Sequence, residues 1–328
     1  MKLNVGLNPY GLTYHLGLQG KGTPRVNPDG KGLEGFIAIA TELKARVLEI
    51  FDPWLAELSD LQLVELSKRL AGLGMTPVVS AGLNMMGPME SAFRSARLLD
   101  AKIVRLGLSP VLEGSRHAWG AKWTELQTFI HEALAKNAPI AAAEGRILAI
   151  ENHQDFGSAE LVGFCGQYGS AMGITLDTGN TFPVGEAPMD FIRRAAPLVR
   201  HVHFKDYRVQ HTDEGYRLVR CAIGDGAVPL KQMMAVLATH HESMNAVLEP
   251  GALEARHIRF FKPDWWNGYS PMAAKDFAAC LAAARVNRLP EDADYRTPWE
   301  QGADGELAAY ELEMIRQSAD NMRKIGLM

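Results

Sequence analysis

Short apolar segments alternate with amphipathic segments eight times along this chain. The apolar segments are rich in Ile, Leu and Val and are bounded by Gly, Pro or Asn, which is typical of strands buried on both faces. Strands are predicted at residues 2–7, 46–51, 76–80, 102–107, 146–151, 172–177, 199–205 and 245–250. Between them, stretches such as 61–73 and 123–143 place apolar residues at helical spacing. This alternation predicts parallel βαβ units, and eight of them favour an α/β fold, a closed (β/α)8 TIM barrel.

An open, doubly wound sheet is the alternative to the barrel. The turn after the first strand, Asn8-Pro-Tyr-Gly-Leu, lacks the GxGxxG pattern of dinucleotide-binding sheets. An open sheet would also gather its functional residues at one switch point rather than on four consecutive strands. We therefore predict a single domain, with the barrel over residues 1–289. Residues 290–328 are predicted to form a C-terminal helical extension packed on the barrel, with a helix over 305–324.

Polar side chains close four successive predicted strands. They are Glu151, Asp177, His203 and Glu249. If the strands are parallel, their carboxyl ends meet on one rim, so three carboxylates and one imidazole converge there. Such a cluster would repel itself without a cation, and its oxygen-rich donor set suits one divalent metal ion. Mn²⁺ or Mg²⁺ is the expected ion, with Co²⁺ or Zn²⁺ as alternatives.

The bulk properties limit the classes of function. The chain has 328 residues, 47% of them hydrophobic, and a formal net charge of −4, which argues against a nucleic-acid surface. Its three cysteines form no CxxC pair, which favours a reduced, cytoplasmic setting. No apolar run approaches the length that a membrane span needs. We expect a cytoplasmic protein that acts on a small molecule.

Residues two positions from the predicted ligands share their strand face. His153 can therefore reach the pocket beside Glu151, and Lys205 can reach it beside His203. Lys205 would hold a substrate carboxylate, a phosphate or a developing oxyanion; alternatively it pairs with Glu49, inside the second strand. Glu49 and Arg105 both interrupt apolar strands, so we expect them to point inward and to pair structurally.

Two long segments, residues 8–31 and 206–227, are expected to leave the barrel as loops on the rim of the predicted ligands. In the first, His15 is a candidate substrate contact, together with Tyr10 and Tyr14. The aromatic pair Trp265 and Trp266 either walls the same rim or is buried against the C-terminal tail or in a homo-oligomer contact.

Four motifs carry a resemblance to a known family. Glu-Asn-His at 151–153, Leu-Asp-Thr-Gly-Asn at 176–180, His-Val-His-Phe-Lys-Asp at 201–206 and Leu-Glu-Pro-Gly at 248–251 resemble the xylose isomerase-like TIM-barrel superfamily, in its sugar phosphate isomerase/epimerase branch. The resemblance implies a metal site made by the four residues above. It also implies that Glu151 and Glu249 act as the acid/base pair around a metal-held enediolate.

The chain departs from the ketose 3-epimerases of that branch at two positions. Asn180 stands where those enzymes typically carry His, and Val209 stands where they carry Arg, with Arg208 one place earlier. Asn180 and Arg208 are therefore candidate substrate contacts. The expected function is isomerisation or epimerisation of a small keto-sugar or sugar acid. The alternative is a decarboxylase or dehydratase of a keto-sugar acid, similar to 3-oxo-isoapionate decarboxylase or inosose dehydratase.

Two other classes of function stay open at this stage. An abasic-site endonuclease of the same superfamily would need a larger metal cluster and a basic groove, and a nicking assay on abasic DNA separates it. A non-catalytic sugar-binding barrel would keep the fold without turnover.

Overall fold

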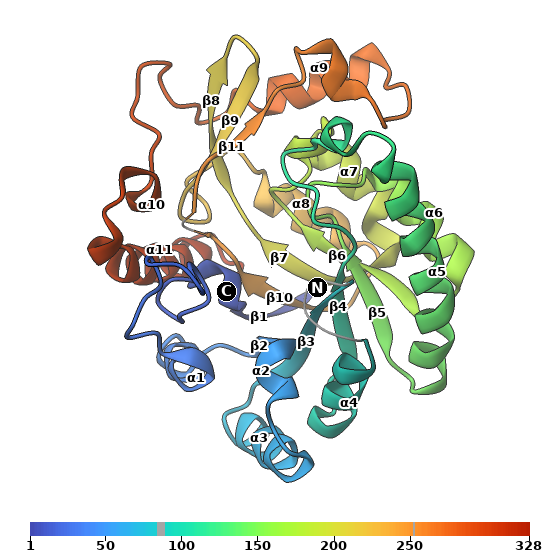
Figure 1. Cartoon of the computed structure of the whole chain (residues 1–328), viewed down its shortest axis with the longest axis vertical. Helices are drawn as coiled ribbons and strands as arrows, with labels where there is room; N and C mark the ends of the chain where they lie inside the picture. The colour runs from blue at the N-terminus through green and yellow to red at the C-terminus, as the bar shows by residue number, and fades with distance from the viewer. Residues whose placement is uncertain (84–88, 252) are drawn as a thin grey trace.

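Eight parallel strands close into a barrel in the computed structural model, which describes residues 1–83, 89–251 and 253–328 (Figure 1). Neighbouring strands follow the order β1-β10-β7-β6-β5-β4-β3-β2, so that β10 closes the barrel against β1. The bounds are β1 Lys2–Leu7, β2 Val47–Phe51, β3 Thr76–Gly82, β4 Ile103–Gly107, β5 Ile147–Glu151, β6 Met172–Asp177, β7 Val199–Phe204 and β10 Ser243–Leu248. The closed barrel and its eight predicted strands are thus confirmed.

Helices surround the barrel and cover its outer face (Figure 1). They are α1 Gly32–Glu42, α2 Asp52–Ala56, α3 Asp60–Gly72, α4 Met89–Leu99, α5 Lys122–Ala143, α6 Ser158–Tyr168, α7 Pro188–Ala195 and α8 Leu230–Ala238. Helix α3 illustrates why they form: Ser59 and Gln62 make a capping box at its start. Its buried face consists of Leu63, Leu66 and Leu70, and burying each leucine contributes about 1.5–3 kcal/mol.

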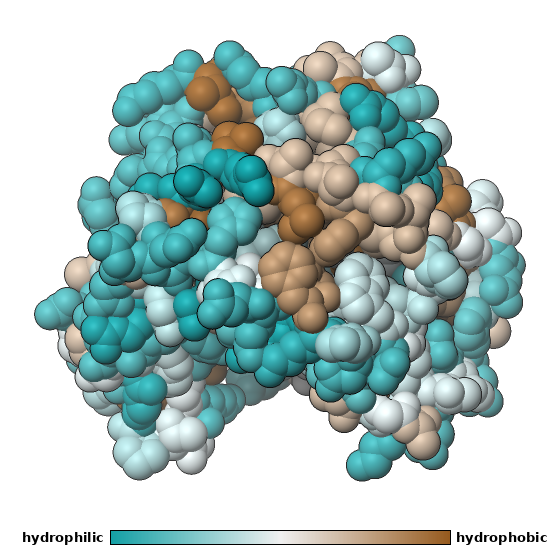
Figure 2. All heavy atoms as spheres, turned by 90° about the horizontal axis from the view of Figure 1, so that it is seen from above, coloured by the Kyte–Doolittle hydropathy of each residue, from teal (hydrophilic) through white to brown (hydrophobic). Residues whose placement is uncertain are grey.

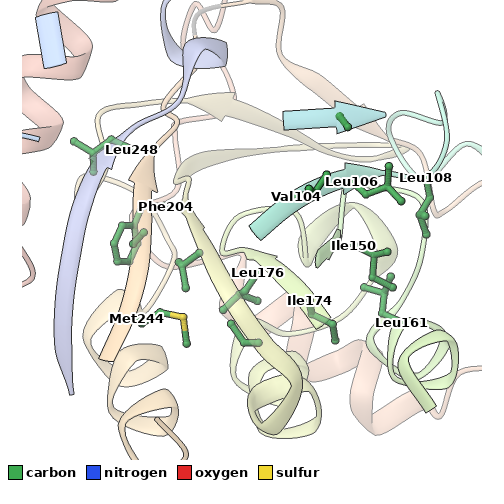
Figure 3. Packing of buried hydrophobic residues seen from close by; sticks show 14 of the residues in the cluster. Val104, Leu106, Leu108, Ile150, Leu161, Ile174, Leu176, Phe204, Met244 and Leu248 are labelled. Atoms are coloured by element: carbon green, nitrogen blue, oxygen red, sulfur yellow. The ribbon is translucent and has the colours of Figure 1, made fainter. Parts of the chain in front are cut away.

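Strand alternation divides the barrel residues into two sets. Ile150, Leu176, Phe204 and Leu248 belong to the apolar core shared with the helices (Figure 3). Each stands directly before or after a predicted ligand in the sequence, so the ligand points to the opposite, interior face. The two-residue alternation of each strand therefore puts apolar side chains in the outer core and the predicted ligands inside the barrel.

The floor of the barrel interior is apolar. Val47, Val78 and Val247 form a separate buried cluster, and Ile103 packs against it. Two residues further along their strands come polar side chains, among them Glu49 and Arg105. Because successive inward residues are two positions apart, the interior passes from this apolar layer to a charged layer toward the carboxyl ends of the strands.

The segment 206–227 is not a loop, contrary to expectation. It contains β8 Tyr207–Thr212 and β9 Gly215–Arg220, which pair antiparallel and are joined by β11 Arg256–Ile258 into a three-stranded sheet (Figure 1). The strands were not predicted because their apolar residues alternate with Arg, Gln and His and form no continuous apolar run. We call this sheet the β-arm.

The C-terminal residues form helices that return to the barrel. After α9 Ala274–Ala283 and α10 Pro298–Gln301, helix α11 Asp304–Lys324 runs where a helix over 305–324 is predicted. It buries Leu307, Ile315 and Met322. The carboxylate of Glu311 accepts hydrogen bonds from the backbone N–H groups of Tyr14 and His15, at 3.0 and 2.8 Å. Helix α11 thus anchors the first loop.

An apolar patch lies on the face seen from the side of α9 (Figure 2). A groove in this region is lined by Trp266, Tyr269, Pro271, Met272 and Phe277, among others. Across the described residues, none of the helices combines the length and the apolar character that crossing a bilayer requires.

Candidate metal centre

Four side chains converge at the carboxyl ends of β5, β6, β7 and β10. Glu151, Asp177, His203 and Glu249 each contribute one ligand atom, and these atoms lie within 4.8 Å of one another. All four residues are buried. We call them the ligand cluster. Their strands are consecutive in the barrel, and Asp177 lies beside His203 in the strand register, so parallel pairing brings the side chains together.

The ring of His203 is held from both sides. Its Nε2 donates to Glu49 Oε2 at 2.6 Å, across the barrel interior. Its Nδ1 lies 3.1 Å from Glu151 Oε1 and 2.8 Å from Glu249 Oε2. A carboxylate on the far nitrogen of a metal-bound histidine fixes the ring and its tautomer. Glu49 therefore leaves Nδ1 as the nitrogen that faces the ligand cluster, a role that the sequence did not suggest.

Lys205 lies inside the cluster rather than beside it. Its ammonium group is 2.6 Å from Asp177 Oδ2 and 2.6 Å from Glu249 Oε1. The alternative partner, Glu49, instead contacts His203 and His201, the latter at 2.9 Å. Lys205 therefore reaches the face shared with His203 as predicted, but its contacts are with two candidate ligands. The pairing with Glu49 is wrong.

Two further polar residues fix the glutamates. Arg105 Nη2 donates to Glu151 Oε2, so the inward pairing predicted for Arg105 is found with a candidate ligand. Asn8 Nδ2 donates to Glu249 Oε2 at 2.7 Å and to Glu49 Oε1 at 3.3 Å. Asn8 was missed in the sequence, where an Asn before Pro9 reads as a turn signal. Its position directly after a predicted strand was the available clue.

Asp177 is positioned by backbone groups. Asn152 accepts from the Asp177 N–H at 2.7 Å and donates to the Asp177 carbonyl at 2.8 Å, which ties the end of β5 to the end of β6. Asp177 Oδ1 accepts from the N–H groups of Gly179 and Asn180, both at 3.0 Å. The carboxylate is therefore oriented before any ligand arrives.

The charges of this region match a divalent cation. The three carboxylates of the ligand cluster and Glu49 carry four negative charges when ionised. Arg105 and Lys205 supply two positive charges. With His203 neutral, as a metal ligand must be, a divalent ion restores neutrality in a buried region where net charge is costly. The donor set, carboxylate oxygens with one imidazole, also suits such an ion.

Burial and neighbouring charges shift the pKa values of the residues in the ligand cluster. Burial opposes ionisation of Glu151, yet Arg105 and then His203 lower the pKa of Glu151 to about 2. Burial would depress the pKa of His203, but Glu49, Glu249 and Glu151 raise it well above its ordinary value. Burial raises the pKa of Asp177 to about 6 despite the nearby Lys205. The titration of His203 is therefore tied to the three carboxylates that surround it.

Two of the predicted substrate contacts lie next to the cluster. His153 is partly buried, and burial lowers its pKa to about 4; among charged groups, Glu151 and then Arg105 affect that pKa most. Asn180 is fully buried; its Oδ1 accepts from the Tyr207 hydroxyl at 3.3 Å. Its Nδ2 has no hydrogen-bond partner among the described residues. Both residues therefore remain candidates for contact with a substrate bound at the ligand cluster.

Two further predicted substrate contacts, Arg208 and His15, lie elsewhere. Arg208 on β8 directs its Nε toward the Asn287 carbonyl, 3.4 Å away, and Val209 is buried in the β-arm. The half-buried His15 is held through its backbone N–H by Glu311. The structure does not bring Arg208 or His15 into contact with the ligand cluster.

Of the remaining aromatic candidates, one lies near the charged side chains inside the barrel and the tryptophan pair is buried in packing. Tyr10 approaches the charged layer, with the Arg105 guanidinium 5.5 Å from its ring centre, and burial raises its pKa to about 12. Trp265 is buried and stacks on Tyr269, with ring centres 4.9 Å apart, and Trp266 donates to the Phe260 carbonyl. The tryptophan pair is packed into the structure around α9 and does not contact the ligand cluster.

A closed barrel of eight parallel strands with such a cluster at its carboxyl ends defines a class of TIM-barrel proteins. The family described as xylose isomerase-like TIM barrel matches residues 37–263, more than half of the chain. This chain belongs to that family.

The solved structures that resemble it share its fold. D-psicose 3-epimerase from Clostridium cellulolyticum H10, solved with D-tagatose, is 18% identical, with a TM-score of 0.54 over 90% of this chain and 93% of that chain. The IolI protein, solved with a bound zinc atom, is 14% identical, with a TM-score of 0.51 over 88% of this chain and 96% of that chain.

A curated relative matches over a shorter stretch. The uncharacterized protein YihM of Escherichia coli strain K12 is 29% identical over 94 residues, which is 28% of this chain. The match spans 29% of the length of that relative.

Proposed function

We propose that this protein is a divalent-metal-dependent isomerase or epimerase of a small keto-sugar or sugar acid. The observation that carries the proposal is the ligand cluster itself: four donor atoms within 4.8 Å of one another, buried at the carboxyl ends of four barrel strands. This end of the barrel is where enzymes of this fold hold their active sites.

The cluster offers two carboxylates for proton transfer. Glu151 ends β5 and Glu249 follows β10, and two strands, β6 and β7, lie between them in the barrel. The two carboxylates therefore approach the cluster from different sides. Arg105 with His203 keeps the pKa of Glu151 near 2 despite burial, and Lys205 with His203 keeps that of Glu249 well below its ordinary value. Both are ionised at neutral pH, as a general base must be.

A bound divalent ion would polarise a carbonyl and the neighbouring hydroxyl of the substrate. Glu151 or Glu249 then removes the proton from the carbon next to the carbonyl, which gives an enediolate. The other glutamate, once it has taken up a proton from solvent, returns that proton to the opposite face and inverts the carbon. Return of the abstracted proton to the neighbouring carbon instead moves the carbonyl. His153 and Asn180 are proposed to contact the substrate hydroxyls.

A decarboxylase or dehydratase of a keto-sugar acid is the second candidate. It is favoured by the two positions at which this chain departs from the ketose 3-epimerases, Asn180 and Val209. Val209 is apolar and buried, and Arg208 beside it is turned toward Asn287, so neither supplies a cation to the cluster. The same carboxylates would serve this chemistry.

Exchange of substrate hydrogen with solvent tests the proposal. Protein loaded with Mn²⁺ or Mg²⁺ is incubated in D2O with a panel of ketoses and keto-sugar acids, and products are read by NMR and mass spectrometry. We expect deuterium at the carbon next to the carbonyl, and we expect Glu151→Gln and Glu249→Gln each to lower the rate by about 100-fold or more, the scale of a lost acid/base group.

Two outcomes would contradict it. Full activity in Glu249→Gln would remove that residue from the acid/base pair. Loss of carbon dioxide or water from the panel compounds, without exchange in unreacted ketoses, would favour the second candidate. Glu65→Gln, on the exposed face of α3, serves as the matched control because that residue lies outside the barrel interior.

A further inference from the structure

Two arginines share one face of the β-arm. Arg220 ends β9, directly opposite Tyr207 on β8, and Arg256 begins β11, opposite Leu218. Because side chains alternate along a strand, Arg220 and Leu218 point to the same side, and so does Arg256 beside Leu218. The two guanidinium groups are therefore diagonal neighbours. Their face is the buried one, since Tyr207 and Leu218 are fully buried.

The positive charges of this pair are incompletely matched by the protein. Arg256 is only 8% exposed, and its Nη1 contacts Glu254 at 2.8 Å, but its Nε is buried without a hydrogen-bond partner among the described residues. Arg220 also has a buried Nε without a partner, and its side chain has no hydrogen bond or ion pair within the described part of the chain. Burial, and then Arg220, lower the pKa of Arg256.

Two neighbouring, partly buried positive charges are energetically costly unless an anion binds between them. Buried guanidinium N–H groups without partners also lose their hydrogen bonds to water without replacement. The nearby acids reduce this cost only in part. Glu254 is already engaged by Arg256, and Glu311 accepts from the backbone of the first loop.

The pair lies beside the ligand cluster. A methyl group on Gly251, two residues after Glu249, would overlap the guanidinium of Arg220, so this arginine packs directly on the strand end that carries a candidate ligand. Gly251 also has a φ of +67°, which favours glycine. On the other side, Tyr207 donates to Asn180, and the Asn180 N–H binds the Asp177 carboxylate.

We propose that Arg220 and Arg256 form a subsite for the anionic end of the substrate, which the β-arm places next to the metal centre. The chemical group is an oxyanion, a carboxylate or a phosphate, because a guanidinium fork binds both through paired N–H donors. The Nδ2 of Asn180, which is buried without a partner among the described residues, would be a further donor to the same ligand. This inference rests on the proposed function only for the position of the reacting carbonyl.

In this proposal, the positive charges that bind the anionic end of the substrate are those of Arg220 and Arg256, and not that of Lys205. The Lys205 ammonium group is held between Asp177 and Glu249, so it neutralises the cluster. An anion at Arg220 and Arg256 would leave those contacts intact. The β-arm, which the barrel itself does not require, would then be the element that selects acidic substrates.

Matched probes of six carbons test the subsite without turnover. D-gluconate, D-glucose 6-phosphate and the neutral D-glucitol are titrated by calorimetry into the Mg²⁺-loaded protein and its variants. We expect at least one anionic probe to bind about 10-fold or more tightly than glucitol. Arg220→Gln and Arg256→Gln should each weaken that probe by about 10- to 100-fold, and leave glucitol unchanged, as expected for a lost charge-assisted contact.

The control is Arg217→Gln, on the same strand β9 but on the opposite face, where Arg217 contacts Gln210 and the Tyr295 ring. Its anion affinity should equal that of the wild type. Arg220→Lys keeps the charge without the fork and should lose less than Arg220→Gln, which preserves the test if the glutamine variant is unstable. Preference for gluconate identifies a carboxylate, and preference for glucose 6-phosphate identifies a phosphate.

Two results would overturn the inference. One is a wild type that binds neither anion better than glucitol; the other is Arg220 and Arg256 variants that bind the anions as the wild type does. Repeating the titrations without Mg²⁺ separates binding at the arginines from chelation of the metal. Failure of the proposed function would appear differently, as absent hydrogen exchange in a protein that still binds anions through these arginines.

Discussion

His203 Nε2 lies 2.6 Å from Glu49 Oε2, on the side of the ring that faces away from the ligand cluster. Glu49 comes from β2 and His203 from β7, so the contact crosses the barrel interior. The carboxylate holds the proton on Nε2 and thereby assigns Nδ1 to the cluster. The position of the imidazole is thus decided by a residue that is not itself in the cluster.

Glu49→Gln is expected to weaken divalent metal binding. Loss of such an outer carboxylate typically costs about 10- to 100-fold in metal affinity, because the ring loses its orientation and basicity. Competition between the protein and a chelating dye for Mn²⁺ measures the effect, and Glu65→Gln is the control. An unchanged affinity, in a variant with the wild-type circular dichroism spectrum, would show that Glu49 does not position the ring.

Removal of the proposed metal is expected to destabilise the protein. A ligand present at 100 times its dissociation constant adds about 2.7 kcal/mol to the free energy of unfolding. Melting temperatures in EDTA and in added Mn²⁺, Mg²⁺, Co²⁺ or Zn²⁺ therefore measure both binding and preference. The double variant Glu151→Gln/Asp177→Asn should lose the shift, and its full metal occupancy by elemental analysis would exclude the proposed ligands.

Lys205→Met is expected to destabilise the metal-free protein more than the metal-loaded protein. The ammonium group neutralises Asp177 and Glu249, and removing one partner from a buried ion pair costs about 3–5 kcal/mol. A divalent ion would replace part of that positive charge. Urea unfolding with EDTA or with Mn²⁺ measures the difference. Lys231→Met, on the exposed face of α8, is the control. Equal losses in both states would place Lys205 outside the electrostatics of the cluster.

Glu311 should make stability depend on pH. Burial raises the pKa of Glu311 to about 7, above its unfolded value of about 4.3. A raised pKa in the folded state adds stability that is fully present below the unfolded pKa and is lost as the pH rises through about 7. The loss amounts to a few kcal/mol at most, since each pKa unit corresponds to about 1.4 kcal/mol.

Glu311→Gln should therefore flatten the decline of the urea midpoint between pH 5 and pH 8, measured in EDTA. The slope is the informative quantity, because the amide also changes the hydrogen bonds to Tyr14 and His15. Glu313→Gln lies on the exposed face of the same helix and should keep the wild-type slope. Parallel profiles for Glu311→Gln and the wild type would contradict the assignment.

The alternation of apolar and amphipathic segments was enough to predict the barrel strands and the α11 helix. Local patterns determine these elements, because burial on both faces selects continuous Ile, Leu and Val runs. The same reasoning failed for β8 and β9. One face of this pair carries Arg208, Gln210, Thr212 and Arg217, and the apolar residues of the opposite face are buried only because the β-arm folds onto the barrel.

The sequence by itself determined which four residues meet. Glu151, Asp177, His203 and Glu249 stand at strand ends, and parallel strands must bring their carboxyl ends to one rim. Closure of the barrel decided the rest. It placed Glu49 behind His203, Lys205 between two carboxylates and Asn8 on Glu249, while the folding of the β-arm placed Arg220 against Gly251. Those contacts join residues far apart in the chain, and their geometry depends on strand register and on side-chain reach across the interior, which no local pattern encodes.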